Sequence, residues 1–546
     1  MKKTHRLYRL IGRLLPFMLA LALCLAQTAS AAGIRISGPL IYGPVKSYQV
    51  ASTGAFAVYH TMEPNYTPHL FSVSLNEAAP VSLTSPLPME DQYYSMQYKI
   101  TPNGSRVLYS AFQESATVTS LFSIPIGGGT PVRLSGTGIS AYNIVISSDN
   151  QWVVFLGFDS GGKSRLYRAA VLGATGSAVA ITPAAASSMY YDLAISPDNA
   201  HVVFLGTLAP LDGWGIYSIP IGGGGYTRLT YPMTTNWIVD YHITPDSQRV
   251  ILRFMDQASE PDVMRLYSVP MDGPYTSYYN LSGTLVSGGG VMPYFQISPD
   301  GKYVVFAAIK ERANTIELYS YFLAAQLPSI TVPVKLSVPI ADNKYVSYAN
   351  FKISPDSTRV IYFADMYNPH DLFSVPIGGP LTSNVQLNHP VSPSFALSWD
   401  DSALFTPDSS RVVYTSMQDT QNVIDLYSVP AAGPDSAAVK INPAQWLDPN
   451  GFAIVQSPAV SADGRSVFYT MTATANRRDL FKSPVNGPAS QSENLSQISY
   501  DGGSISSFVE APSGVRVIYR ASQTSASQEL FMVKIPAIRY LPVVRK

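Results

Sequence analysis

The chain has 546 residues, of which only 13% are charged, and its 36 Lys and Arg balance its 36 Asp and Glu. This length exceeds what one compact hydrophobic core supports, so it indicates several domains or a repeat array. A formal net charge of zero argues against a nucleic-acid partner, which would need a basic surface. Tyr (35 residues), Gly (38) and Pro (42) are abundant, and this composition is typical of strands joined by tight turns.

The first 32 residues have the pattern of a secretory signal peptide. A basic start is followed by the apolar run LLPFMLALALCLA, from Leu14 to Ala26, and then by the small residues of TASAAG. This run is short for a membrane span, and an uncleaved N-terminal anchor is the alternative. We therefore expect an extracytoplasmic protein, secreted or periplasmic, with no integral membrane segment after cleavage. The only cysteine, Cys24, lies within the run, which leaves the mature chain without disulfides or a thiolate metal site.

From Tyr48 onward, near-copies of one strand–turn–strand motif recur along the chain. Examples are YKITPNGSRVLYS from Tyr98, LAISPDNAHVVFL from Leu193, FQISPDGKYVVFA from Phe295 and FKISPDSTRVIYF from Phe351. The turn falls at residues 53, 102, 148, 197, 245, 299, 355, 407, 462 and 512. These ten copies, at a spacing of about 50 residues, indicate a repeat architecture that fills the mature chain.

Each repeat contains four predicted strands. The first two are joined by a turn with Pro and Asp, followed by Gly or Asn where the backbone needs a positive φ, as in a type I turn with a bulge. Ser247, Ser357 and Ser409 fit this last position less well. A third strand of the type LFSVPIGG ends at a glycine turn, and a short fourth strand such as PVRLS follows. The C-terminal IRYLPVVRK is interpreted as the last outer strand.

Four antiparallel strands per repeat predict an all-β chain of about ten four-stranded β-propeller blades. One four-stranded sheet cannot cover both of its apolar faces, so neighbouring blades must cover them. The ten blades could form one large ring, or two tandem smaller propellers divided near residues 270–290. A linear β-solenoid is less compatible, because its repeats are shorter. We assign residues 1–32 to the signal peptide and residues 33–546 to the propeller repeats.

The motifs ISPDGKYVVFA and LFSVPIGG resemble the WD40-like, or PD40, repeat of TolB-like propellers over roughly residues 48–536. The resemblance implies the propeller fold. It implies no single activity, because such repeats occur in periplasmic Tol-system components and in the propeller domains of prolyl oligopeptidase-like peptidases. This chain lacks the small α/β domain expected before a TolB propeller, and it has more blades than TolB.

The repeats also predict which face of the ring binds. The first-to-second and third-to-fourth turns are short and uniform, whereas the other two connections of each repeat vary freely and lie at the opposite end of the strands. Variable loops on a rigid scaffold usually carry binding, and exposed aromatic side chains supply contact area there. The candidate binding residues are Tyr93, Tyr94, Asn143, Tyr191, Asp192, Trp237, Asp240 and Asn350. Backbone capping and gap filling are the ordinary alternative roles for these residues.

No catalytic or metal motif stands out in the sequence. There is no G-x-S-x-G, the histidines show no H-E-x-x-H pattern, and no calcium-loop or Walker motif occurs. We expect no cofactor, no metal site and no catalytic residue. Acidic residues before the third strand, such as Glu317, Asp371 and Asp425, are interpreted as blade-to-blade hydrogen-bond partners. Carboxylates of the loop face could still serve a glycosidase if two of them lie close together.

The sequence therefore predicts an exported, non-catalytic propeller that binds a protein or a cell-wall or extracellular glycan. One alternative is a carbohydrate- or peptide-active enzyme that uses carboxylates of the loop face. A second is a structural surface-layer component, in which the repeats supply only bulk.

Overall fold

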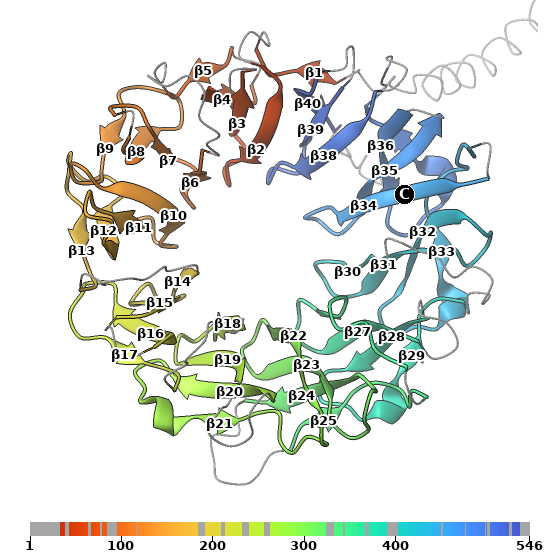
Figure 1. Ribbon diagram of the computed structural model, residues 1–546. Coiled ribbons are helices and arrows are strands. Elements are labelled where there is room, and N and C mark those ends of the chain that lie inside the picture. Colours follow the sequence, from red (N-terminus) through yellow and green to blue (C-terminus); the bar gives the residue numbers. More distant parts are fainter. Residues whose placement is uncertain are drawn as a thin grey trace, which may run out of the picture.

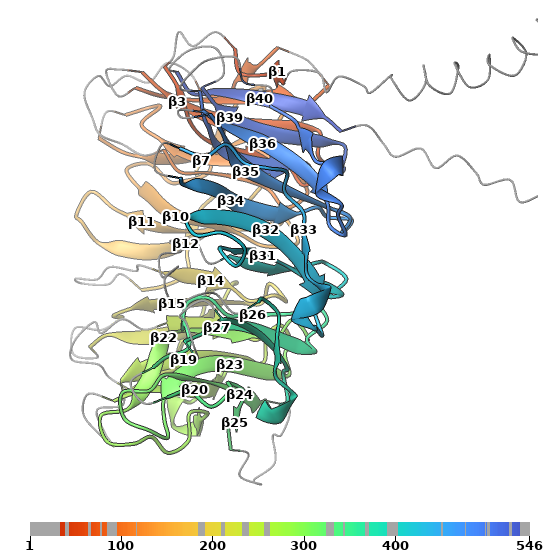
Figure 2. The same cartoon turned by 90° about the vertical axis from the view of Figure 1, so that its right-hand side faces the viewer.

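The computed structural model contains ten units of four antiparallel strands arranged around one ring (Figure 1), and we call each unit a sheet. The eighth and ninth units are joined into one eight-stranded sheet, because Val423 and Ile424 pair in parallel with Ala453 and Ile454. The sequence left open one ring or two, and the structure has one. From the side, the ring is a disc whose strands run across its thickness (Figure 2). The structure describes residues 33–38, 43–63, 67–76, 79–84, 96–115, 117–183, 192–208, 213–231, 240–255, 263–323, 332–341, 344–365, 371–389, 402–448, 451–474, 477–496, 498, 503–522 and 527–535.

Sheets 1 to 5 follow one another along the chain, and each runs from an inner to an outer strand. Sheet 1 is β2 (Val45–Val50), β3 (Phe56–Met62), β4 (Pro68–Ser74) and β5 (Val81–Ser82); sheet 2 is β6 (Tyr98–Ile100), β7 (Arg106–Ala111), β8 (Ser120–Pro125) and β9 (Val132–Arg133). Sheet 3 is β10 (Ser140–Ile146), β11 (Trp152–Phe158), β12 (Ser164–Ala170) and β13 (Val179–Ala180); sheet 4 is β14 (Leu193–Ile195), β15 (His201–Gly206), β16 (Gly215–Pro220) and β17 (Thr227–Arg228). Sheet 5 is β18 (Asp240–Ile243), β19 (Arg249–Met255), β20 (Met264–Pro270) and β21 (Tyr279–Asn280).

Sheets 6 to 9 repeat this order. Sheet 6 is β22 (Gly290–Ile297), β23 (Tyr303–Ile309), β24 (Glu317–Phe322) and β25 (Val334–Lys335); sheet 7 is β26 (Lys352–Ile353), β27 (Arg359–Ala364), β28 (Asp371–Pro376) and β29 (Val385–Gln386). Sheet 8 is β30 (Ala403–Phe405), β31 (Arg411–Ser416), β32 (Val423–Pro430) and β33 (Val439–Lys440); sheet 9 is β34 (Ala453–Val460), β35 (Ser466–Thr474), β36 (Arg477–Pro484) and β37 (Glu493–Asn494). The 3-10 helices η2 (Tyr275–Ser277), η3 (Leu381–Ser383), η5 (Asp435–Ala437) and η6 (Ala489–Gln491) follow the third strands of sheets 5, 7, 8 and 9.

Sheet 10 closes the ring with strands from both ends of the chain. It consists of β38 (Ile505–Glu510), β39 (Arg516–Ala521), β40 (Glu529–Lys534) and the outer strand β1 (Ile34–Arg35), which pairs antiparallel to β40. β1 thus occupies the outer position of sheet 10, where the sequence led us to expect the C-terminal residues. Residues 536–546 lie outside the described part of the chain.

The core consists of apolar clusters between neighbouring sheets. One cluster joins Leu70 of sheet 1 to Tyr109 of sheet 2, another joins Leu266 of sheet 5 to Phe306 of sheet 6, and all four side chains are fully buried. A cluster of the same kind joins sheet 10 to sheet 1. Buried apolar area stabilises the fold by about 25 cal/mol per Å², so each sheet depends on both of its neighbours. The packing is continuous across residues 270–290.

Stacked aromatic rings join the second and third strands within nine of the sheets. Their ring centroids are 5.3–5.9 Å apart, and the two residues of each pair face each other in the strand register. The pairs are Tyr59–Phe71, Tyr109–Phe122, Phe155–Tyr167, Phe204–Tyr217, Phe306–Tyr319, Tyr362–Phe373, Tyr414–Tyr427, Tyr469–Phe481 and Tyr519–Phe531. Directly opposed rings of this kind stabilise a strand pair beyond the area they bury.

The turn between the first and second strands has a left-handed residue in every sheet. The φ angle is positive at Gly54, Gly104, Asn150, Asn199, Ser247, Gly301, Ser357, Ser409, Gly464 and Gly514. The sequence prediction of a positive φ at this position is therefore confirmed, including at the three serines.

The serines and asparagines at this position compensate for their strained backbone. The backbone N–H of Asp300 donates to Ser357 Oγ in the next sheet over 3.0 Å, and that of Asp356 donates to Ser409 Oγ over 3.0 Å. Asn199 accepts the backbone N–H of Ser148 in the same way, over 2.9 Å. A polar side chain here therefore links two blades, which a glycine cannot do.

Because every sheet is antiparallel, its turns divide between two faces of the ring. The first-to-second and third-to-fourth turns lie on one face, which we call the turn face. The second-to-third and fourth-to-first connections lie on the other, which we call the loop face. The inner strands lie nearest the axis of the ring (Figure 1).

Gly301→Val tests the left-handed turn. Gly301 has φ +73°, and a Cβ atom there would lie 3.4 Å from Pro245 of the neighbouring sheet. Valine is strained at this φ, so we expect the free energy of unfolding to fall by about 1–3 kcal/mol, measured from urea denaturation. Gly301→Asn is the matched control and should change stability little, because Asn150 and Asn199 occupy the same position. Equal stability of the two variants would contradict the turn assignment.

Acid should weaken the same turns. At Asp408 the hydroxyl of Thr406, followed by the backbone N–H and hydroxyl of Ser410, lowers the pKa of the carboxyl group. A folded-state pKa below the unfolded one means that the ionised form stabilises the fold at neutral pH, and that this stabilisation is lost as the pH falls below about 4.

We expect Asp408→Asn to lower the free energy of unfolding at about pH 7 but not at about pH 2. Asparagine preserves the turn geometry, since Asn103 accepts the hydroxyl of Thr101 over 2.9 Å in sheet 2. The reverse change, Asn103→Asp, should add stability only at neutral pH. If Asp408→Asn lowers the free energy of unfolding equally at both pH values, the charge of Asp408 does not have this role.

Candidate functional site

The inner strands position the side chains that are nearest to the ring axis and the loop face. β2, β10, β22, β34 and β38 each contain a register shift against the second strand of their sheet. On β10 and β34 this bulge places non-glycine residues in the left-handed region, with φ 52° at Asn143 and 53° at Ser457. Bulges of this kind redirect side chains and are common beside binding sites.

Side-chain amides join some inner strands directly. Gln49 Nε2 donates to the carbonyl of Tyr98 over 3.1 Å, and Gln49 Oε1 accepts the N–H of Ile100 over 3.4 Å. Gln296 makes the same pair of bonds to the inner strand of sheet 7. These amides form hydrogen bonds between inner strands whose backbones do not pair. Some polar residues on inner strands therefore have a structural role.

The predicted residue Asn143 takes part in a similar link. Its backbone N–H donates to Oε1 of Gln97, which precedes the inner strand of sheet 2, over 2.8 Å. Its side chain is half-buried. This contact favours the capping role that the sequence offered as the ordinary alternative.

The predicted residues Asp192 and Asp240 occur at equivalent places in neighbouring sheets, where their inner strands begin. Burial raises the pKa of Asp240; the charges of His242 and Arg253 lower it, and that of Asp192 raises it. Nε2 of His242 lies 3.9 Å from Oδ1 of Asp240, and Arg253 faces Asp240 across the strand pair. The structure thus brings these two predicted carboxylates within electrostatic reach of each other, with two basic residues beside them.

Other predicted residues are separated from this pair or cannot be placed. Tyr93, Tyr94, Tyr191 and Trp237 lie outside the described residues. Asn350 is exposed in the connection between sheets 6 and 7, where its backbone N–H donates to the carbonyl of Ser347 over 3.3 Å.

The segment around Asn350, residues 344–350, forms an anchored part of the loop face. The backbone N–H of Val346 donates to Ile316 of sheet 6 over 2.9 Å, and that of Ser347 donates to Phe363 of sheet 7 over 3.0 Å. The side chain of Val346 is fully buried beneath the segment. Nζ of Lys344 contacts both carboxylate oxygens of Asp365, at 3.0 and 2.9 Å.

Two tyrosines extend from this anchored segment. Tyr345 is 46% exposed and Tyr348 is 40% exposed. Their backbone is fixed on two sheets, so their rings can contact a ligand at a low cost in conformational entropy. The sequence prediction selected Asn350 but not these two neighbours.

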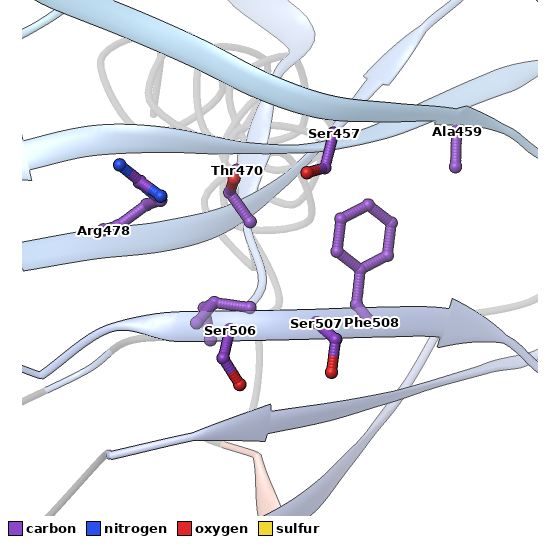
Figure 3. A pocket seen from close by; sticks show the side chains of 8 residues that line it. Ser457, Ala459, Thr470, Arg478, Ser506, Ser507 and Phe508 are labelled. Atoms are coloured by element: carbon purple, nitrogen blue, oxygen red, sulfur yellow. The ribbon is translucent and has the colours of Figure 1, made fainter. Parts of the chain in front are cut away.

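A pocket opens between sheets 9 and 10 (Figure 3), and its lining extends from the loop-face ends of β36 and β38 to the middle of the strands. Its volume is about 230 Å³, and it is lined by Ser457, Ala459, Thr470, Arg478, Ile505, Ser506, Ser507 and Phe508. Phe508 extends from β38 toward β34, whereas the side chains of Ser506 and Ser507 point to the other side of β38 (Figure 3). Among these lining residues, Arg478 alone carries a charge.

Sequence reasoning missed this pocket. Arg478 lies two residues before the third-strand leucine Leu480, where the repeats show no constant residue type. The ninth repeat has Ser-Pro before its turn, in QSPAVSADG, and the bulge of β34 falls there. Four other inner strands are also bulged, so this signal alone would not have located the pocket.

The acidic residues before the third strands form contacts within their own sheets, so the interpretation as blade-to-blade partners is wrong. Asp371 accepts from Gln386 over 3.2 Å, and Glu529 pairs with Arg35 over 2.9 Å; in both cases the partner lies on the outer strand of the same sheet. Glu317 is bound by Lys335 of its own outer strand. These carboxylates are buried and hold the short outer strand in place.

The described residues contain neither a candidate metal site nor a candidate membrane helix. No group of three or more His, Cys, Asp or Glu side chains in this part of the chain could hold a metal ion. Within the same residues, no helix is long and apolar enough to cross a membrane.

Asp192→Asn and His242→Gln test the charge coupling around Asp240. Removing the Asp192 charge should lower the pKa of Asp240, and removing His242 should raise it, because the two charges act in opposite directions. Carboxyl-carbon NMR over a pH titration measures both shifts. Asp419→Asn, an exposed change in sheet 8, should leave the Asp240 pKa unchanged. If all three variants titrate like the parent protein, the two carboxylates do not interact.

Comparison with known proteins adds a likeness in fold. No family model and no curated protein matches the sequence. An oligogalacturonate lyase solved in complex with manganese is 14% identical, with 74% of this chain and 99% of that chain covered and a TM-score of 0.35. A eukaryotic initiation factor is 12% identical, with 80% and 96% covered and a TM-score of 0.44. TolB from Acinetobacter baumannii is 16% identical, with 50% and 62% covered and a TM-score of 0.27. At these identities the likeness concerns the fold alone.

Proposed function

We propose that this protein is an exported, non-catalytic binding propeller that recognises a protein or glycan partner through its loop face. The observation that carries the proposal is the anchored segment 344–350, which presents Tyr345 and Tyr348 from a base fixed on two sheets. Phe452, 44% exposed in the connection between sheets 8 and 9, adds a further ring on the same face. Aromatic side chains on rigid supports bind sugar rings and peptides well.

The distribution of buried charge supports a binding role. Glu317, Asp371 and Asp425 are all buried and paired with side chains of their own sheets. Such carboxylates are committed to holding strands together and are not available to a substrate. Export rests on the signal-like residues 1–32, which lie outside the described part of the chain.

A second candidate is a carbohydrate- or peptide-active enzyme centred on Asp192 and Asp240. Burial raises the pKa of Asp240 and the charge of Asp192 raises it further, which favours this candidate because a general acid must hold its proton near neutral pH. Turnover of a glycan or peptide panel that is abolished by Asp240→Asn would support this candidate over the binding role.

Replacing the two tyrosines tests the binding role. We expect the protein carrying both Tyr345→Ala and Tyr348→Ala to lose at least about ten-fold in retention of its partner, because hot-spot aromatics commonly contribute this much. The measurement is a pull-down from cell-wall material and from exported proteins, followed by an affinity titration of whatever the parent protein retains. Tyr279→Ala is the matched control, since Tyr279 is 61% exposed on the outer strand of sheet 5. Undiminished retention by the double variant, with the control also unchanged, would exclude this surface.

A further inference from the structure

The pocket between sheets 9 and 10 combines one cation, hydroxyl groups and an aromatic ring in a small space. Arg478 contributes a guanidinium group from the start of β36, Thr470 and Ser457 contribute hydroxyls, and Phe508 contributes a ring face. Figure 3 shows these side chains around one space, with Arg478 beside Thr470 and Phe508 opposite Ser457. The residues come from β34, β35, β36 and β38, so the site exists only where two sheets meet.

The charge of the pocket selects anions. No carboxylate occurs among the lining residues, whereas the guanidinium of Arg478 has the planar fork that matches a carboxylate. Ser506, which also lines the pocket, is already hydrogen-bonded within its own sheet. Ser506 Oγ accepts from Arg520 Nε over 2.8 Å, and it lies 2.8 Å from Gln528 Oε1, to which it donates. As the only charged residue among those that line the pocket, Arg478 is the group that would select a ligand by charge.

The remaining groups favour a ring that carries hydroxyls. The bulge at Ser457 places an exposed hydroxyl beside the pocket, and Thr470 adds a second one, which donates to the carbonyl of Gln456 over 3.3 Å. Phe508 and the methyl group of Ala459 provide apolar contact between these hydroxyls and β38. Aromatic rings pack on the C–H face of a sugar while hydroxyl groups exchange hydrogen bonds with its rim.

The size of the pocket limits the ligand to one small unit. A volume of about 230 Å³ is below the roughly 300–1,000 Å³ of sites that enclose drug-sized ligands. One sugar residue of a longer chain fits this description better than an extended peptide does.

We propose that this pocket binds the carboxylate of an acidic sugar residue, with Arg478 on the carboxylate and Phe508 against the sugar ring. The inference rests on the proposed function, since it names the ligand class for one part of the loop-face end of the ring. It differs from that proposal in location, because segment 344–350 lies on sheets 6 and 7.

Calorimetric titration of the mature chain tests the inference with three probes. Sodium D-glucuronate is the acidic sugar, D-glucose is its neutral counterpart, and N-acetylglycine carries a peptide-type carboxylate without a sugar ring. We expect glucuronate to bind at least about ten-fold more tightly than either of the others. If glucose binds as tightly as glucuronate, Arg478 has no role in selecting the ligand. If N-acetylglycine binds more tightly than glucuronate, the ligand is a peptide terminus and not an acidic sugar. Absence of glucuronate binding overturns the inference.

Variants locate the binding in this pocket. Arg478→Gln should weaken glucuronate binding at least about ten-fold and bring it to the level of glucose, because it removes the charge but keeps hydrogen-bond donors. Arg465→Gln is the matched control, since this exposed arginine belongs to the same sheet but lies on the turn face. Urea denaturation of each variant confirms that it is folded. Glucuronate binding retained by Arg478→Gln would refute the assignment.

A second variant fills the pocket without changing its charge. Ala459→Leu should abolish glucuronate binding, and Ala194→Leu, at the equivalent inner-strand position of sheet 4, should not. Glucuronate binding that survives Ala459→Leu overturns the location even if Arg478→Gln does not fold.

The two proposals fail in different ways. Loss of partner retention by Tyr345→Ala with Tyr348→Ala, together with no glucuronate binding by the parent protein, leaves the loop face as the binding surface and removes the pocket. Glucuronate binding by the parent protein, with partner retention unchanged in the tyrosine double variant, keeps the pocket and removes segment 344–350 as the binding surface.

Discussion

Each four-stranded sheet of this protein has two apolar faces, and only a neighbouring sheet can cover each of them. The cluster that joins Leu70 to Tyr109 shows the arrangement. Leu70 lies on the third strand of sheet 1 and Tyr109 on the second strand of sheet 2, and both side chains are fully buried. An isolated sheet would expose both faces and lose most of its apolar stabilisation. A ring satisfies this requirement without end sheets, because the cluster between sheets 10 and 1 is of the same kind as the others. The rest of the structure depends on this mutual coverage.

Mutual coverage determines where function can be located. The middle strands are occupied by packing and stacked rings, and the turn face by Asp side chains that bind their own backbone, as Asp408 does. The outer strands are held by buried carboxylates such as Glu529. The candidate sites are associated with the loop-face ends of the strands. Segment 344–350, the Asp192–Asp240 pair and the Arg478 pocket all lie there, in different sectors of the ring.

Much of the fold could be predicted because its signals are local. A left-handed residue occurs in every turn, and most turns also have Pro or Asp within four positions, so the positive φ of Ser357 follows from its place in that motif. The bond from Asp300 to Ser357 crosses 57 residues and has no local signature. The same limit applies to the site. Asp192 and Asp240 hold equivalent positions in adjacent repeats and could be selected, whereas Arg478 and Phe508 line one pocket only because sheets 9 and 10 pack side by side.

The two-residue strand β1 has a consequence for how the protein is made. Its residues, Ile34 and Arg35, precede every other described strand, and their partners Met532 and Phe531 belong to the last one. The ribosome therefore synthesises one strand of this pair first and the other last, with nine complete sheets between them. Until the final strand is synthesised, the sheets at the two ends of the incomplete ring each have an apolar face that no neighbouring sheet covers. Exposed apolar faces of this kind favour association with other chains. The seam also gives the finished molecule a check on completeness, since a chain truncated before β40 has no strand to which β1 can pair.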